Sequence, residues 1–372
     1  MMTPLLAGTL KHLRSLVSFD TRNPPRAIGT GGIFDYLRLQ LVGFDTSVID
    51  HGAGAVTLFA SRGNPKILFN VHLDTVPSQH AWSRDPLDLL VTDNHAIGLG
   101  ACDIKGAAAA LVAAAANTRG PAAFLFTTDE EANDARCIAA FLDRKLPFDT
   151  VIVAEPTKCE AVLAHRGISS VVMRFQGRAG HASGDAALAD SALHQAVRWG
   201  ANALKLVESR MHERFGGLTG IRFNIGRIEG GVKANVIAPS AELRFGFRPL
   251  PSMDTDQLLS EFFKCDDGNA PLFSESFRGP ALPSGDVATA EERRLAARDA
   301  ADALGLPIGN AVDFWTEASL FSAAGYTTFV YGPGNIAQAH TADEFVDLSQ
   351  LQKVTESYVR IIDQGLARHG YA

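Results

Sequence analysis

Short, continuous runs of apolar residues alternate with helical patterns in the first and last parts of the chain. Five runs have strand length, at residues 55–60, 67–71, 122–127, 151–154 and 327–331. Apolar residues with helical spacing occupy 5–17, 33–41, 105–117, 135–142 and 289–304. Strands that are buried on both faces have such continuous runs, and their alternation with helices predicts the α/β class, with a mostly parallel, helix-covered sheet.

The middle of the chain has a different pattern. Residues 167–176 and 220–229 alternate apolar with polar side chains, and 236–247 do so more loosely, which is typical of half-buried antiparallel strands. Helices are expected over about 190–213 and 254–263, and a last strand near 271–277. This β-α-β-β-α-β order predicts a small α+β module.

The two patterns together predict a discontinuous domain organisation. Pro280, Pro283 and Gly285 mark the return from the middle pattern to the first one. We therefore expect a catalytic domain built from residues 1–165 and 280–372, with an α+β domain inserted at 166–279.

Four of the predicted strands lead into histidine or acidic residues. These are His72 with Asp74, the doublet Glu130-Glu131, Glu155 and, after a glycine-rich loop, His340. In an open α/β sheet, ligands bind outside the carboxyl ends of the strands. Imidazoles and carboxylates suit Zn²⁺, Co²⁺ or Mn²⁺, so the sequence predicts a metal site at that edge of the sheet.

Two aspartates fit such a site. Positions two apart in a strand point to the same side, so Asp74 could hydrogen-bond the far nitrogen of His72 and fix the ring. Asp103 begins the alanine-rich helix, where the helix dipole favours a carboxylate. Each residue alone has an ordinary alternative, since an Asp at a helix start is commonly a cap and adjacent acids are commonly solvated. Their coincidence at the ends of several apolar runs favours the metal site.

Six stretches also match, in order, the motifs of a known family. They are LFNVHLDTVP at 68–77, GACDIKG at 100–106, TDEE at 128–131, EPT at 155–157, GRAGHAS at 177–183 and HTADEF at 340–345. Over essentially its whole length the chain resembles the dinuclear zinc amidohydrolases, which include acetylornithine deacetylase, succinyl-diaminopimelate desuccinylase, aminoacylases and the glutamate carboxypeptidases. One departure is ANDA at 132–135, where relatives commonly have two glycines.

The resemblance implies a zinc-exopeptidase-like catalytic domain and a ferredoxin-like inserted domain that serves in dimerisation or as a lid. It also implies two Zn²⁺ ions per subunit, for which Co²⁺ or Mn²⁺ could substitute. His72 and Glu155 would hold one metal, Glu131 and His340 the other, and Asp103 would bridge them.

The same resemblance implies roles for three groups that hold no metal. Asp74 would orient His72, and Glu130 would act as the general acid/base that moves a proton from water to the leaving amine. His181 would donate to the oxyanion of the tetrahedral intermediate. Because His181 lies in the inserted module, it would reach the metals by domain closure or from a partner subunit. The resemblance favours the partner, in a homodimer formed through the inserted domains.

Further matches concern the substrate. Asn235 and Arg248 look like substrate contacts, Arg248 by a bidentate grip on the α-carboxylate. The loop with Gly332 and Gly334 is expected to line the pocket with backbone amides. The best resemblance is to the acetylornithine/N-acetylcitrulline deacetylase branch, which implies arginine biosynthesis and a small N2-acetylated amino acid, acetylcitrulline ahead of acetylornithine. Glu317 is the obvious candidate for a carboxylate facing an ammonium. A succinyl-diaminopimelate desuccinylase and a general aminoacylase or dipeptidase are the alternatives.

Composition and missing motifs exclude other classes. The net charge of −7 is spread without long runs of like charge, so neither nucleic acid nor a membrane surface is an expected partner. A signal peptide and a long apolar span are absent from the sequence, and the four cysteines are scattered, which favours the cytoplasm. Asp103 occupies the third glycine position of a dinucleotide fingerprint, and no GxSxG elbow is present. An inactive binding protein would be expected to have lost Glu130 or a ligand, and none is lost.

Overall fold

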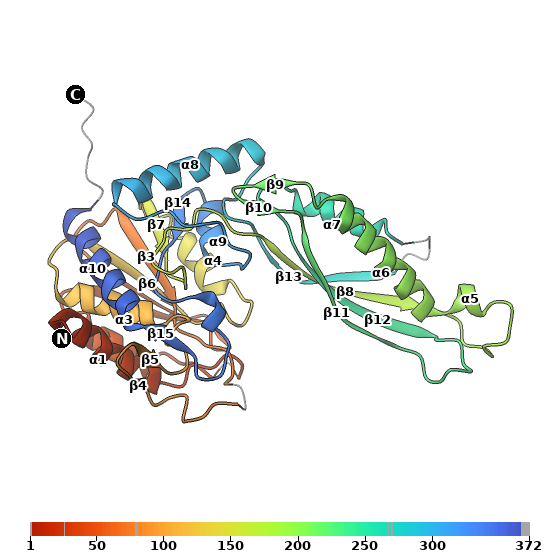
Figure 1. The fold of residues 1–372 in the computed structure, drawn as a ribbon, viewed down its shortest axis with the longest axis horizontal. Helices are drawn as coiled ribbons and strands as arrows, with labels where there is room; N and C mark the ends of the chain where they lie inside the picture. Colours follow the sequence, from red (N-terminus) through yellow and green to blue (C-terminus); the bar gives the residue numbers. More distant parts are fainter. Residues whose placement is uncertain (1, 26, 79–80, 267, 269–270, 366–372) are drawn as a thin grey trace. The chain divides into compact units, whose positions relative to one another are not determined.

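The chain forms two compact units in the computed structural model, which describes residues 2–25, 27–78, 81–266, 268 and 271–365. The first unit contains the residues up to Leu163, then Glu292–Asn310, then those from Thr316 onward (Figure 1). The second contains Ala164–Glu291 and Ala311–Trp315. It extends beyond residue 280 because the backbone N–H of His165 donates to the carbonyl of Leu282, 2.8 Å away.

Six strands form the sheet of the first unit, in the order β1-β2-β6-β3-β7-β14. Their bounds are β1 Asp45–Asp50, β2 Val56–Arg62, β3 Ile67–His72, β6 Ala122–Thr127, β7 Thr150–Val153 and β14 Thr327–Val330. The four strands from β6 to β14 are parallel, whereas β1 and β2 are antiparallel additions at one edge. The sheet is therefore mixed with a parallel centre. The sequence analysis missed β1, whose side chains are almost all exposed and lack an apolar run.

Helices cover both faces of this sheet. On one face α1 (Pro4–Ser18), α3 (Lys105–Ala116) and α10 (Leu348–Gln364) pack together, and on the other lie α4 (Arg136–Leu142) and α9 (Ala318–Ala323) (Figure 1). Eleven of the twelve residues of α3 are buried, which its small alanine side chains permit. Two further helices are α2 (Ile33–Gln40) and α8 (Val287–Ala303). Among the described residues, no helix is long and apolar enough to cross a membrane.

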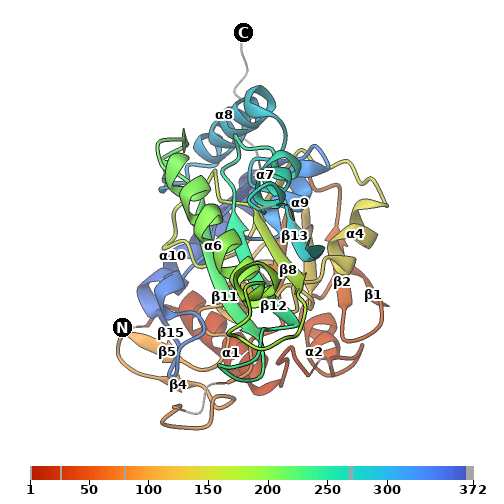
Figure 2. The same cartoon turned by 90° about the vertical axis from the view of Figure 1, so that its right-hand side faces the viewer.

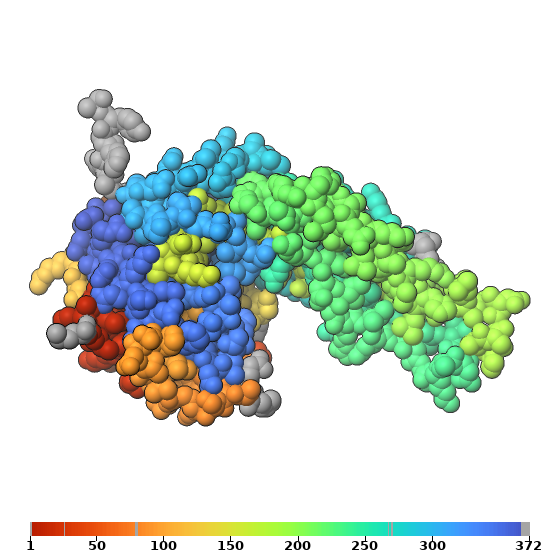
Figure 3. Space-filling view, viewed as in Figure 1, coloured from red at the N-terminus to blue at the C-terminus, as the bar shows by residue number. Residues whose placement is uncertain are grey.

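A small three-stranded sheet joins the C-terminal part of the chain to an early segment. β15 (Phe345–Asp347) pairs with β5 (His95–Ile97), which pairs with β4 (Leu90–Val91). Figure 3 shows the two segments side by side on the surface, coloured blue and orange. The pairing fixes the segment that follows His340.

The second unit is an antiparallel sheet in the order β11-β12-β8-β13. The strands are β8 Ile168–Gln176, β11 Arg222–Gly230, β12 Ser240–Arg248 and β13 Leu272–Gly279, and the helices are α6 Ala192–Ser209 and α7 Thr255–Phe263. Both helices cover one face (Figure 2), and the alternate apolar residues of the strands pack there against Trp199 and Phe262. Short elements complete the unit: α5 Ala187–Asp190, β9 Arg214–Phe215 and β10 Leu218–Thr219. The chain order β-α-β-β-α-β agrees with the sequence pattern.

Candidate active site

Five side chains gather at the carboxyl ends of the parallel strands in two groups of three. His72, Asp103 and Glu155 form one group, and Asp103, Glu131 and His340 form the other. Within each group, one potential ligand atom per residue lies within 4.8 Å of the others. The two groups share Asp103, as the sequence analysis expected for a bridging ligand.

The two oxygens of Asp103 face different histidines. Oδ1 lies 3.2 Å from Nε2 of His72, and Oδ2 lies 3.3 Å from Nε2 of His340. Glu155 Oε1 is 3.8 Å from the same His72 nitrogen, and Glu131 Oε1 is 3.0 Å from that of His340. Because each oxygen belongs to its own group, Asp103 has the geometry of a carboxylate that serves two cations.

Electrostatics test whether these residues fit metal ions. Burial raises the pKa of Glu155 well above its usual value, since its charged form has left water. Burial opposes protonation of His72, but its bonds to Asp103 and Asp74 raise the pKa well above that of a free imidazole. The bonds of His340 to Asp103 and Glu131 raise its pKa to about 11. The buried carboxylates therefore attract positive charge. Metal cations would supply such charge, and the imidazole and carboxylate donors suit Zn²⁺.

Asp74 contacts both groups, although not as the strand geometry predicted. β3 ends at His72, so Asp74 lies beyond the strand, and the closest partner of His72 Nδ1 is the backbone carbonyl of Asp74, at 3.0 Å. Carboxylate Oδ1 is 3.4 Å from the same nitrogen. Oδ2 accepts from the backbone N–H of Glu131 at 3.0 Å and from Asn23 Nδ2 at 3.2 Å. One carboxylate therefore braces a residue of each group.

Glu130 belongs to neither group and is half-buried beside them. Burial raises its pKa well above the usual value, and the charges of Glu131 and Glu155 add to this effect, against His72. Three residues further on, Asn133 has a φ of +51°. Asn tolerates this left-handed conformation better than most residues, which explains how the chain turns after the doublet without a glycine.

Two buried residues that the sequence analysis did not single out hold these loops. Asn23 Nδ2 donates to Asp74 Oδ2 and, at 3.0 Å, to the carbonyl of Thr128. The carboxylate of Glu344 accepts from the backbone N–H groups of the loop that carries Asp103. Glu344 lies in the matched stretch 340–345, but its partners are more than 240 positions away, so no local pattern identifies them.

The loop after β14 corrects one expectation. The N–H of Gly332 donates to Thr157 Oγ1 at 3.0 Å, and that of Gly334 donates to Gln350 Oε1 at 2.7 Å. Both amides are used inside the protein and are not available to a substrate. The glycines instead allow close packing, because a Cβ on Gly332 would lie 2.6 Å from the carbonyl oxygen of Glu155.

Glu317, the expected partner of a substrate ammonium, is a buried residue of the first unit. It is 1% exposed and accepts from Thr127 Oγ1 at 3.1 Å, at the end of β6. Burial raises its pKa to about 8, and the charge of Asp129 adds to the effect. Glu317 precedes α9 as a buried residue, and its contact with a substrate ammonium stays a prediction.

The second unit carries the three remaining residues. His181 is exposed, and its Nδ1 lies 2.7 Å from Ser183 Oγ. Asn235 is exposed beside it, since its carbonyl accepts from the N–H of Ala182 at 3.1 Å. Arg248, at the end of β12, lines a cavity of about 450 Å³ on the sheet face opposite the helices.

Comparisons with known proteins identify the family of the chain. The model of peptidase family M20/M25/M40 matches residues 68–364. N-acetyl-L-citrulline deacetylase of Xanthomonas campestris pv. campestris is 72% identical over 363 residues, covering 97% of this chain and 99% of the relative. Acetylornithine deacetylase of Yersinia pseudotuberculosis is 30% identical over 320 residues, covering 81% and 79%.

Solved structures share the fold. An M20 family metallo-carboxypeptidase from Sulfolobus solfataricus superposes with a TM-score of 0.71 at 16% identity, covering 97% of this chain and 99% of that one. A dinuclear metal binding peptidase of the M20 family from Bacillus subtilis has a TM-score of 0.62 at 14% identity, covering 96% and 97%. Matched along most of its length by the family model and along almost all of it by a close relative, the chain belongs to peptidase family M20/M25/M40.

Proposed function

We propose that this chain is a zinc-dependent deacetylase that hydrolyses N-acetyl-L-citrulline to citrulline and acetate, a reaction of arginine biosynthesis. The relative that is 72% identical carries that activity in its name. The observation on which the proposal rests is the pair of ligand groups joined by Asp103, with the half-buried Glu130 outside both groups.

In this proposal His72 and Glu155 hold one Zn²⁺, Glu131 and His340 hold the second, and Asp103 bridges them. When bound, the two ions would lower the pKa of a water molecule and polarise the acyl carbonyl. The protein's part is to keep the five ligands in place. The carboxylate of Asp74 contributes by its contacts with His72 and the Glu131 amide.

Glu130 moves the proton. Its carboxylate takes a proton from the attacking water as the C–O bond forms, and passes it to the amine nitrogen as the C–N bond breaks. The raised pKa makes this carboxylate a stronger base than an exposed glutamate, which favours taking the proton from water. His181 donates to the oxyanion, Arg248 grips the α-carboxylate, and Asn235 contacts the substrate.

The choice of substrate follows from the end of its side chain. Acetylornithine has an ammonium there and acetylcitrulline a neutral ureido group. Glu317, the carboxylate expected to favour the ammonium, is buried and bonded to Thr127. This placement supports the neutral substrate. Acetylornithine remains the second candidate, because relatives with that activity are 30% identical.

Two measurements test the proposal. The first compares kcat/KM for acetylcitrulline, acetylornithine, acetylmethionine and succinyl-diaminopimelate, where a clear preference for a substrate other than acetylcitrulline overturns the substrate assignment. The second compares Glu130→Gln with the wild type. We expect the variant to retain both metals and lose most turnover. A fall in metal content would contradict its role as a group outside the metal shells.

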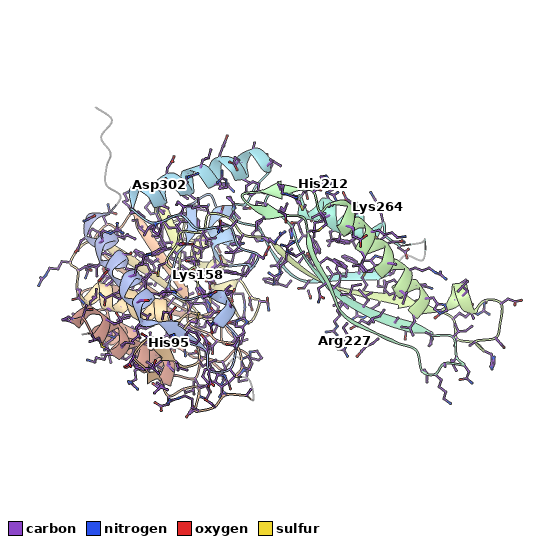
Figure 4. The ribbon with its side chains drawn as sticks, viewed as in Figure 1. His95, Lys158, His212, Arg227, Lys264 and Asp302 are labelled. Carbon is purple, nitrogen blue, oxygen red and sulfur yellow. The ribbon has the colours of Figure 1, made fainter. Side chains whose placement is uncertain are left out.

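We further propose a homodimer formed through the second unit. β11 is an edge strand of its sheet, and Arg227 lies on it (Figure 4). Apolar side chains are exposed on this strand and on α6: Ile228 by 44%, Val197 by 59% and Leu204 by 49%. An edge strand with exposed apolar neighbours favours association with a second copy.

Active-site complementation tests whether His181 acts across that dimer. His181→Ala and Glu130→Gln are each expected to be nearly inactive. Mixed dimers contain one site with both native groups if His181 is supplied by the partner, so activity should return on mixing. No recovery, with subunit exchange verified, would place His181 in the same chain as its metals. The cytoplasmic location remains a prediction from the sequence.

A further inference from the structure

Glu344 binds the loop that carries Asp103 through both its backbone and its side chain. Its carbonyl accepts from the N–H of Gly98 at 3.0 Å, continuing the β5–β15 pairing by one step. Its carboxylate then reaches along the loop. Oε2 accepts from the N–H of Gly100 at 3.1 Å, and Oε1 accepts from those of Cys102 and Asp103 at 2.8 and 2.9 Å.

These three bonds form in a dry place. Glu344 is 2% exposed, so water cannot substitute for the carboxylate as an acceptor. A buried N–H that loses its partner costs about 1–3 kcal/mol, so all three amides favour the observed position of this side chain. The loop also packs closely at Gly100, where an added Cβ would lie 2.8 Å from Thr75 Cγ2.

The bond to the N–H of Asp103 gives this arrangement a consequence for the metals. Asp103 is the residue common to both ligand groups, and His340 lies four positions before Glu344 in the same segment. Glu344 therefore ties the loop of the shared ligand to the segment that supplies a ligand of the second group. A change in its position must alter both groups, because both depend on Asp103.

We propose that Glu344 is a positioning residue of the dinuclear centre, which sets the place of Asp103 through its backbone amide. This inference rests on the proposed metal site and adds a residue to it. Glu344 itself is buried and belongs to neither ligand group. Its effect on turnover arises through Asp103.

The test is Glu344→Gln in the full-length protein, freed of metal and titrated with Co²⁺, whose visible absorption reports ligand geometry. Glutamine has nearly the same size as glutamate, but an NH₂ group replaces one carboxylate oxygen. A donor would then face a backbone N–H that now has an acceptor. We expect both Co²⁺ equivalents to bind about tenfold more weakly, which is the lower end of the effect seen when a residue that orients a metal ligand is replaced. The absorption spectrum should change and kcat should fall. If Glu344→Gln does not fold, Glu344→Asp is measured by the same criteria, since it keeps the charge but shortens the reach.

Asp343→Asn is the matched control. This neighbouring carboxylate accepts from the N–H and Oγ of Ser83, at 3.1 and 3.0 Å, and contacts no ligand loop in the described structure. It should leave Co²⁺ affinity and kcat within about twofold of the wild type. Wild-type affinity and kcat in Glu344→Gln overturn the inference, and so does an equal loss in Asp343→Asn. A wild-type protein that binds no Co²⁺ pair overturns the proposed function itself, which separates the two failures.

Discussion

Gly332→Ala tests whether close packing between strand ends positions Glu155. The added Cβ would lie 2.6 Å from the carbonyl oxygen of Glu155 and 3.1 Å from its nitrogen. Atoms in proteins essentially never approach a Cβ closer than 3.0 Å, so the shorter contact must open by at least 3.0 − 2.6 = 0.4 Å. No left-handed φ is involved at Gly332, so the contact alone makes alanine unfavourable.

The size of the effect follows from overpacking. Forcing one extra methyl group into a filled site costs about 1–3 kcal/mol, which lowers Tm by about 2–4 °C per kcal/mol for a unit of this size. The displaced residue belongs to the first of the two candidate metal-binding groups only. We therefore expect one Co²⁺ equivalent to bind about tenfold more weakly, and the second equivalent to bind as in the wild type.

Calorimetry gives the stability and a Co²⁺ titration gives the two affinities. Gly8→Ala in α1 is the control, because a Cβ there meets nothing within 4 Å and an alanine should stabilise the helix by about 0.5–1 kcal/mol. A Gly332→Ala protein with wild-type Tm and two wild-type affinities refutes the packing argument. Equal weakening of both equivalents refutes the assignment of Glu155 to one group.

Three further predictions concern buried polar groups and the metals. Asn23→Leu removes a hydrogen-bond donor to the carboxylate of Asp74, so metal affinity should fall several-fold in a Co²⁺ titration. As a control, Thr21→Val loses the buried hydrogen bond from Thr21 to the carbonyl of Leu73 and should leave the affinity unchanged. Burial lowers the pKa of Lys105 from 10.5 to about 7, so between these pH values the unfolded chain binds one more proton than the folded protein. In that range the free energy of unfolding of the wild type, measured relative to Lys105→Met, should therefore rise by about 1.4 kcal/mol per pH unit. A difference in urea unfolding that does not change with pH would contradict this prediction. Chelation should abolish turnover and lower Tm, with recovery on adding Zn²⁺, whereas activity that survives metal removal contradicts the proposed chemistry.

Local patterns were sufficient to predict the parallel strands and the residues at their ends. β3 and β6 are six-residue, mostly apolar strands buried along their whole length, so their bounds could be predicted to within a residue. His72 and Glu155 stand directly or soon after such runs, and the topology brings them together. α10 was not predicted, although its buried residues recur with helical spacing from Leu348 to Ile362.

What the sequence could not predict were contacts between distant segments. Glu344 and Asn23 have no distinctive local sequence pattern. Only folding brings Glu344 to backbone amides 241 to 244 positions away, and Asn23 to acceptors 51 and 105 positions away. The use of the Gly332 amide by Thr157 depends in the same way on the pairing of β14 with β7. A carboxylate such as Glu317 cannot be assigned to surface or core from its neighbours alone, since its burial comes from helix packing.

The return of the chain to its first unit sets an order on synthesis. β14, His340 and α10 are made after the whole second unit, including its last segment Ala311–Trp315. At about 5–20 residues per second, a ribosome needs several seconds or more to add them after β7. During that time β7 has β3 beside it but lacks β14, its second parallel partner, and α3 lacks α10, one of the helices that pack against it. The nascent first unit therefore has an open strand edge that a chaperone could recognise, and a chain truncated before residue 327 should aggregate.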